Sequence, residues 1–284
     1  MTDPEFLKAA YGTTDALDIR ISAQSQYAIN RRDLFDTMTE WALSQRQPAK
    51  VLDIGTGTGK WYQSIRRQAA PSVYYVGLDT SPAMVELMVK QTALDRVAKV
   101  VEGDAMALPF DANQFDWVGL HFMLYHVPQP HLALQEAWRV TKPGGLLITL
   151  AHGDDSLSAL WALHREALKH CLSRDLQPVP HTYSLNTGHQ IFPNPSHVSV
   201  MRHPSGLRFP TTESAIAYYG SGFWQRGLSS EEWGSQPIRS CLQQYVAKSI
   251  IQHIQSTGYF DIPGTAGWLW AQKPYIQYIK LTDT

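Results

Sequence analysis

The stretch from Val51 to Trp61, VLDIGTGTGKW, decides the fold of this chain. A short apolar run with one aspartate leads into three glycines at alternate positions, Gly55, Gly57 and Gly59. Such a run is typical of a buried strand, and a glycine-rich turn after it lets a ligand lie against main-chain N–H groups. One glycine would suffice for a tight turn alone, so three favour a bound ligand.

Strand and helix patterns alternate on both sides of this stretch. We expect strands over 49–55, 72–79, 98–105, 115–122 and 145–152, and helices over 31–45, 61–68, 81–91 and 131–142. Ser81 is the expected N-cap of its helix, with Pro82 at the first helical position, and Pro143 with the two following glycines should stop the helix before it. The alternation predicts an α/β fold with a parallel sheet, helices on both faces and ligands beyond the carboxyl ends of the strands.

The pattern changes after Ala151. We expect helices over 156–172, 211–224 and 240–257, an irregular insertion over 177–210, and two strands around a turn in FDIPGTAGWLWAQKP at 260–274. This predicts three parts: an N-terminal helical cap (1–48), a Rossmann-like core (49–151 and 236–284), and an inserted lid for the substrate (152–235).

Composition and charge indicate which binding partners and which cellular compartment to expect for this chain. The 284 residues carry a net charge of -1, so no basic surface for a nucleic-acid backbone is expected. The two cysteines, Cys171 and Cys241, fit neither a disulfide framework nor a zinc site by spacing, and we interpret them as free thiols in a reducing compartment. No secretory signal, membrane span or metal-binding histidine spacing is recognisable, which predicts a cytoplasmic protein without a metal.

Three aspartates end three successive expected strands: Asp53, Asp79 and Asp104. A dinucleotide fingerprint would need glycine where Lys60 stands, and Asp53 would repel a diphosphate. A cationic ligand such as S-adenosylmethionine fits better. Asp53 can attract its ammonium group, Asp79 can accept from both ribose hydroxyls, and Asp104 can accept from the adenine amino group while the N–H of Ala105 donates to the ring.

Five segments, VLDIGTGTG, GLDTSPAMVELM, EGDAMALPF, FDWVGLHFMLYHV and EAWRVTKPGGLLI, resemble in this order the class I S-adenosylmethionine-dependent methyltransferases of the type 11 domain group, which includes ubiquinone- and menaquinone-biosynthesis-like enzymes. The resemblance covers residues 50–150. It implies a seven-stranded, mostly parallel Rossmann-like sheet with an antiparallel last strand. It also implies a cofactor site that leaves S-adenosylhomocysteine as product, built from Asp53, Gly55, Thr56, Gly57, Gly59, Asp79, Thr80, Met84, Asp104, Ala105 and His121.

The N-terminal segment resembles the cap of similar bacterial enzymes, which implies that Tyr11, Arg20 and Tyr27 close over the cofactor. Past the fourth strand, His126 is the first candidate for a catalytic base, and His121 and Tyr125 are further candidates.

The expected activity is methyl transfer to an O, N or C atom of a small, partly hydrophobic acceptor, such as a natural product in its biosynthesis, by a monomer or homodimer. RNA or protein methylation and a non-catalytic cofactor-binding partner subunit are the alternatives.

Overall fold

The computed structural model describes residues 14–176, 183–194 and 197–275 and divides the chain into two compact units. One unit, here the sheet unit, comprises residues 32–152, 182–203 and 266–284; the other, the helical unit, comprises 1–31, 153–181 and 204–265. The helix at 34–45 therefore belongs to the sheet unit, and the helix that follows residue 235 belongs to the helical unit. The expected functional division into cap, core and lid stays a prediction.

The apolar runs around VLDIG form the first five strands of a seven-stranded sheet. These are β1 (Lys50–Ile54), β2 (Tyr74–Asp79), β3 (Ala98–Glu102), β4 (Phe115–His121) and β5 (Thr141–His152). The order across the sheet is β3-β2-β1-β4-β5-β7-β6, and the first five strands are parallel. The chain moves outward from β1 to β3 and returns on the other side at β4, which makes the ends of β1 and β4 the topological switch point.

Helices cover both faces of the sheet because alternate strand residues face opposite sides. Odd-numbered residues Val51, Tyr75 and Trp117 pack with α3 (Leu34–Gln45), α4 (Lys60–Gln68) and α5 (Pro82–Thr92). Even-numbered residues such as Leu52 and Val118 pack with α6 (Pro130–Val140) on the other face. The predicted Rossmann-like fold with a largely parallel sheet is confirmed.

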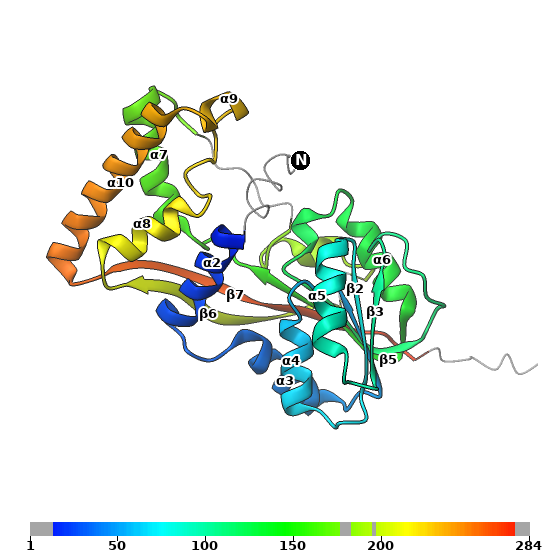
Figure 1. Ribbon diagram of the computed structural model, residues 1–284. Helices are drawn as coiled ribbons and strands as arrows, with labels where there is room; N and C mark the ends of the chain where they lie inside the picture. Colours follow the sequence, from blue (N-terminus) through cyan, green and yellow to red (C-terminus); the bar gives the residue numbers. More distant parts are fainter. Residues whose placement is uncertain (1–13, 177–182, 195–196, 276–284) are drawn as a thin grey trace, which may run out of the picture. The chain divides into compact units, whose positions relative to one another are not determined.

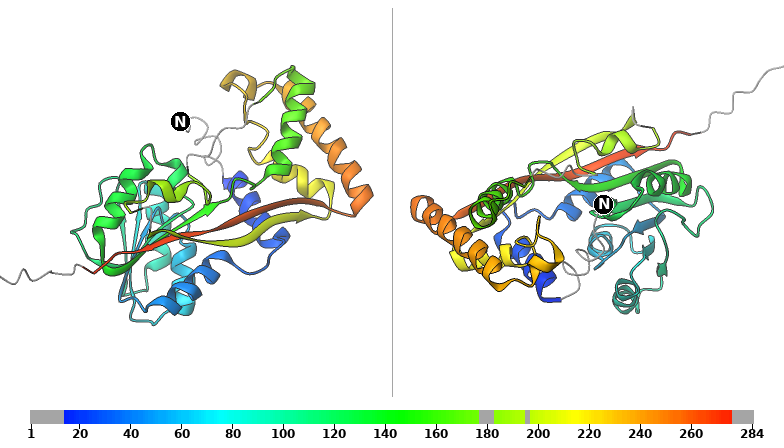
Figure 2. Two further views of the ribbon diagram at one scale, coloured as in Figure 1. Left: turned by 180° about the vertical axis from the view of Figure 1, so that it is seen from behind. Right: turned by 90° about the horizontal axis from the view of Figure 1, so that it is seen from above.

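The last two strands differ from the expected hairpin. The segment at 260–274 was expected to form two strands, but it forms one, β7 (Phe260–Gln272), antiparallel to β5. Its neighbour β6 (Ser199–Phe209) comes instead from the segment expected to be irregular (Figures 1 and 2). A second expectation was also wrong: α6 ends at Val140, before Pro143, and residues 141–145 enter β5 around a break in its pairing with β4.

The helical unit is built from α2 (Thr14–Tyr27), α7 (Ser158–Leu172), α8 (Thr212–Gly220), the short α9 (Ser230–Trp233) and α10 (Gln236–Thr257). Its core contains a histidine that uses both ring nitrogens. His164 is fully buried, with Nε2 2.8 Å from the carbonyl oxygen of Arg226 and Nδ1 2.8 Å from the Tyr219 hydroxyl. Because the carbonyl only accepts, Nε2 carries the proton and Tyr219 donates to Nδ1.

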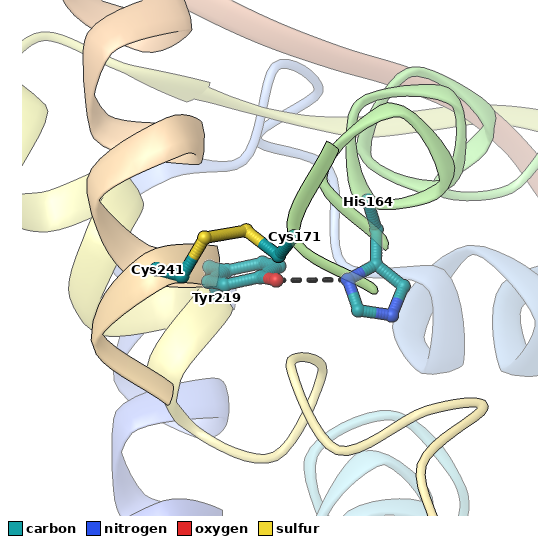
Figure 3. Close-up of a disulfide and its surroundings, with 4 residues drawn as sticks. All are labelled: His164, Cys171, Tyr219 and Cys241. Atoms are coloured by element: carbon teal, nitrogen blue, oxygen red, sulfur yellow. Dashed lines mark hydrogen bonds between the residues drawn. A yellow bond between two sulfur atoms is a disulfide. The ribbon is translucent and has the colours of Figure 1, made fainter. Parts of the chain in front are cut away.

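A disulfide joins α7 to α10 within this unit, between Cys171 and Cys241 (Figure 3). The interpretation of these residues as free thiols was therefore wrong. The cysteines are 70 residues apart, and their pairing follows from the packing of two helices, which their spacing in the sequence does not reveal. Free thiols no longer argue for a reducing compartment, and the cellular location stays a prediction.

Candidate functional site

The loop after β1 has the conformation that only glycine adopts readily. Gly55, Gly57 and Gly59 all have positive φ angles, 70°, 52° and 75°. A Cβ at Gly55 would lie 2.9 Å from Met123 Cγ and one at Gly59 would lie 2.5 Å from Met88 Sδ, whereas beside Gly57 only the carbonyl oxygen of Gly55 comes within 4 Å, at 3.9 Å. The main chain at Gly57 is therefore bare and open, as a ligand cradle requires.

Asp79 holds this loop against the end of β2. Its Oδ2 accepts a hydrogen bond from the N–H of Gly57 at 2.9 Å, and its Oδ1 accepts from the N–H of Ser81 at 2.9 Å. Ser81 is the N-cap residue of α5 and Pro82 stands at its first position, as expected, but the Ser81 side chain makes no capping hydrogen bond. The carboxylate is thus fixed in orientation while each oxygen keeps a further lone pair for a donor.

Asp53 lies under the loop, where its Oδ2 is one of three oxygen atoms within hydrogen-bonding distance of one another. It is 2% exposed, and its Oδ2 is 2.6 Å from the Tyr75 hydroxyl and 3.0 Å from Thr56 Oγ1. Those two hydroxyls are themselves 2.7 Å apart. Burial raises the pKa of Asp53 to about 7, although both hydroxyls act to lower it.

Glycines of both neighbouring strands lie beside Asp53. Asp53 pairs with Gly77 of β2 on one side and with Gly119 of β4 on the other. A Cβ at Gly77 would lie 3.3 Å from Thr56 Oγ1, so a larger residue there would press on the hydroxyl cluster.

The third predicted acidic residue, Asp104, is exposed beyond β3. Its Oδ1 accepts from the N–H of Met106 at 2.8 Å, and its carbonyl accepts from Ala107. The neighbouring Ala105 is buried, whereas Thr80, next to Asp79, is exposed and Met84 is half-buried on α5. The ends of β2 and β3 are adjacent because Asp79 pairs with Glu102, so these residues lie along one edge of the sheet.

His121 ends β4 on the face that α3 and α4 cover. Its ring meets Trp61 edge-on at 4.4 Å and Phe35 at 5.6 Å between ring centres, and neither ring nitrogen has a hydrogen-bond partner among the described residues. Burial lowers the pKa of His121 to about 3. The ring is therefore neutral at physiological pH.

His126 and Tyr125 follow in the short 3-10 helix η1 (Leu124–His126). Their rings meet edge-on at 4.4 Å, and both residues are half-buried. Burial lowers the pKa of His126, which leaves it neutral and able to accept a proton at pH 7.

Two residues that the sequence analysis did not single out are in contact at the ends of β4 and β5. Phe122 has a positive φ of 53°, which is uncommon for a bulky residue, and its ring lies 4.6 Å from that of His152, the exposed last residue of β5. Backbone strain of this kind clusters at functional sites. The sequence carries no signal for it, because nothing in HFMLYH distinguishes Phe122 from an ordinary strand residue.

Tyr11 and Arg20 were predicted to close over the cofactor as cap residues. Tyr11 lies outside the described residues. Arg20 belongs to the helical unit, where its guanidinium donates to the carbonyl oxygen of Ser221 and lies 3.4 Å from Ser221 Oγ.

Two kinds of feature are absent from the described part of the chain. It holds no group of three His, Cys, Asp or Glu residues arranged for a metal ion. It also holds no helix with the length and apolar character that crossing a membrane demands.

Comparisons with known proteins match the segment that carries this site. The family model described as "Methyltransferase domain" matches residues 52–149. Demethylmenaquinone methyltransferases of Staphylococcus aureus strains JH9 and Newman are 39% identical over 112 residues, which cover 39% of this chain and 46% of those proteins. The chain thus matches less than half the length of these relatives.

Solved structures extend the likeness of the fold over most of the chain. YcgJ of Bacillus subtilis is 16% identical with a TM-score of 0.54, and the match covers 85% of this chain and 98% of that one. The 4+2 cyclase SpnF is 15% identical with a TM-score of 0.52, over 95% and 97%. At these identities the comparison concerns the fold alone, and one fold hosts many activities.

Proposed function

The chain carries a class I methyltransferase domain over residues 52–149, and from this premise we propose that it is an enzyme that uses S-adenosylmethionine to methylate a small molecule. The observation that carries the proposal is the bare main chain at Gly57, held by Asp79 above the buried Asp53. The Asp79 carboxylate at the open glycine loop disfavours a diphosphate, and Asp53, which can ionise beside a cation, favours a cationic ligand.

The proposed cofactor site follows the ends of β1, β2 and β3. Asp53 and the glycine loop with Thr56 hold the methionine end, and Asp79 with Thr80 binds the ribose. The adenine lies by Asp104, the N–H of Ala105 and Met84. His121 shapes the pocket wall beyond β4, and Arg20 and Tyr11 are the proposed cap residues.

S-adenosylmethionine, when bound, supplies a methyl group that its sulfonium already activates. The protein must then align the acceptor, exclude water and, where the acceptor is a hydroxyl or a protonated amine, take a proton. His126 is the proposed base, because its lowered pKa keeps it unprotonated at neutral pH. Tyr125 and His121 are weaker candidates, and the pKa of about 3 makes His121 a poor base.

We infer a small, partly hydrophobic acceptor with the methyl group going to O, N or C. The sequence likeness to demethylmenaquinone methyltransferases supports a small-molecule acceptor, and the balanced charge of -1 gives RNA no electrostatic attraction. A role in natural-product biosynthesis, a cytoplasmic location and a monomeric or homodimeric state belong to the same proposal.

The test has two parts. Calorimetry with S-adenosylmethionine and with S-adenosylhomocysteine should detect binding, and NAD should give none. In the second part, a labelled methyl group of S-adenosylmethionine should be transferred into a metabolite extract but not into RNA or protein. Label in RNA or protein would favour that alternative; binding without transfer into any of the three would favour the non-catalytic partner subunit.

A further inference from the structure

Three oxygen atoms under the glycine loop lie within hydrogen-bonding distance of one another. When Asp53 is ionised, the cluster has fewer protons than contacts. Asp53 Oδ2, Thr56 Oγ1 and the Tyr75 hydroxyl lie within 2.6–3.0 Å of one another, which makes three contacts. The two hydroxyls supply two protons. With Asp53 ionised, one pair of oxygens would face each other without a proton between them. A proton on Asp53 completes a closed ring in which each group donates once and accepts once.

The surroundings of the carboxyl group also favour its neutral form. Asp53 is 2% exposed, and the groups that act on its pKa are Tyr75, Thr56 and the negatively charged Asp79, none of them a cation. On the side of β4, His121 faces the same layer and is neutral. A pKa of about 7 agrees with the count of protons.

Other titratable groups packed on this cluster do not offset the charge of Asp53. From α4, the Tyr62 ring lies 5.0 Å from that of Tyr75, and Arg66 pairs with Asp95 at 2.5 Å. An ionised Asp53 would therefore be a buried anion that lacks a cationic partner among the described residues, which is costly. A cationic ligand on the loop above is what would stabilise the ionised form.

We propose that below neutral pH the ligand-free protein holds Asp53 protonated in this three-oxygen ring, and that binding of the cationic amino-acid end of the cofactor expels this proton to solvent. The inference rests on the proposed function and adds a proton to its binding equilibrium. The Asp53 O–H bond breaks, the carboxylate keeps the electron pair, and the buffer takes the proton. Affinity for an ammonium-bearing ligand then falls as the pH drops below about 7, approaching tenfold per pH unit.

The test is calorimetry at pH 6.5 in buffers of different ionisation enthalpy. S-adenosylhomocysteine carries the ammonium group, and 5′-methylthioadenosine has the same nucleoside without it. We expect S-adenosylhomocysteine to release more than half a proton per site, because a group with pKa about 7 is mostly protonated at this pH. We expect methylthioadenosine to bind with no release.

Two further measurements do not need the complex. In ligand-free protein labelled with 13C-aspartate, the carboxyl carbon of Asp53 should titrate near pH 7. Asp53→Asn has no carboxyl proton to release and no carboxylate to face the ammonium group, so it should lose proton release and bind S-adenosylhomocysteine at least tenfold more weakly at pH 8. Tight binding of S-adenosylhomocysteine without proton release, or an Asp53 signal that titrates near pH 4, would overturn the inference and leave the proposed function standing. Failure of both ligands to bind would instead remove the proposed function.

Discussion

Asp79 accepts a hydrogen bond from the main-chain N–H of Gly57 at 2.9 Å, and so ties the end of β2 to the loop after β1. The same carboxylate accepts from Ser81 at the start of α5. One side chain thus sets the position of the loop, the strand end and the helix N-terminus that together form the proposed ribose site.

Replacing Asp79 should therefore weaken cofactor binding for two reasons. Asp79→Ala loses the ribose acceptors and releases the loop, and we expect a loss of about 1–3 kcal/mol in binding free energy. Calorimetry with S-adenosylhomocysteine measures it. Asp104→Ala, at the exposed end of β3, is the comparison and should cost less. Unchanged affinity in the Asp79 variant would refute the ribose assignment.

Gly119 has no side chain, and this leaves space beside β4 for the rings of His121 and Trp61. A Cβ there would lie 2.3 Å from both His121 Nε2 and Trp61 Cζ3, and both residues are buried. We expect Gly119→Ala to lower the free energy of unfolding by about 1–3 kcal/mol, because neither ring has space to retreat. Thermal and denaturant unfolding measure the change. Gly220→Ala, where the nearest atom is 3.9 Å away, should have little effect, and equal stability of the two variants would contradict the packing argument.

The strands that the sequence predicted and those that it missed differ in what stabilises them. β1, β2, β4 and β5 lie inside the sheet and read as apolar runs, so periodicity and apolar content revealed them. β6 is an edge strand whose residues are largely exposed, and its polar composition looked irregular. In β7, Pro263 and Gly264 suggested a turn, but pairing with β5 extends only over residues 266–272, so the proline interrupts no bond to β5.

The sequence likewise predicted only part of the candidate site. Its acids and glycines follow from strand ends and spacing, which are local properties. The hydroxyl of Tyr75 reaches Asp53 from the next strand, and Phe122 reaches His152 from β4 to β5. Such contacts depend on the register between strands, which one sequence does not specify.

The base assignment gives a prediction with a pH dependence. His126→Gln should lower turnover about 100-fold or more while the Kd for S-adenosylhomocysteine stays within about twofold. Burial lowers the pKa of His126 below 6.5, so the neutral, proton-accepting form persists at pH 6.5 and is lost only at lower pH. The kcat profile of the wild type should therefore fall on the acidic side of 6.5.

A nearby histidine provides the control for that variant. His131 is exposed on α6, and His131→Gln should leave turnover unchanged. If the His126 variant keeps the wild-type kcat across the whole pH range, His126 is not the base, and the acceptor either needs none or uses another group.

The disulfide between Cys171 and Cys241 should be a measurable part of the stability of the helical unit. It closes a segment of 70 residues between α7 and α10. By loop-closure entropy, a cross-link of this span destabilises the unfolded chain by about 4 kcal/mol, and strain or residual structure reduces the observed gain. We expect Cys171→Ser with Cys241→Ser to lower the free energy of unfolding by about 2–4 kcal/mol. Unfolding of the wild type with and without a phosphine reductant gives the same comparison without mutation, and the double variant should not respond to the reductant. If peptide mapping finds both thiols free in oxidised protein, or if reduction leaves the unfolding midpoint unchanged, this role of the disulfide is refuted.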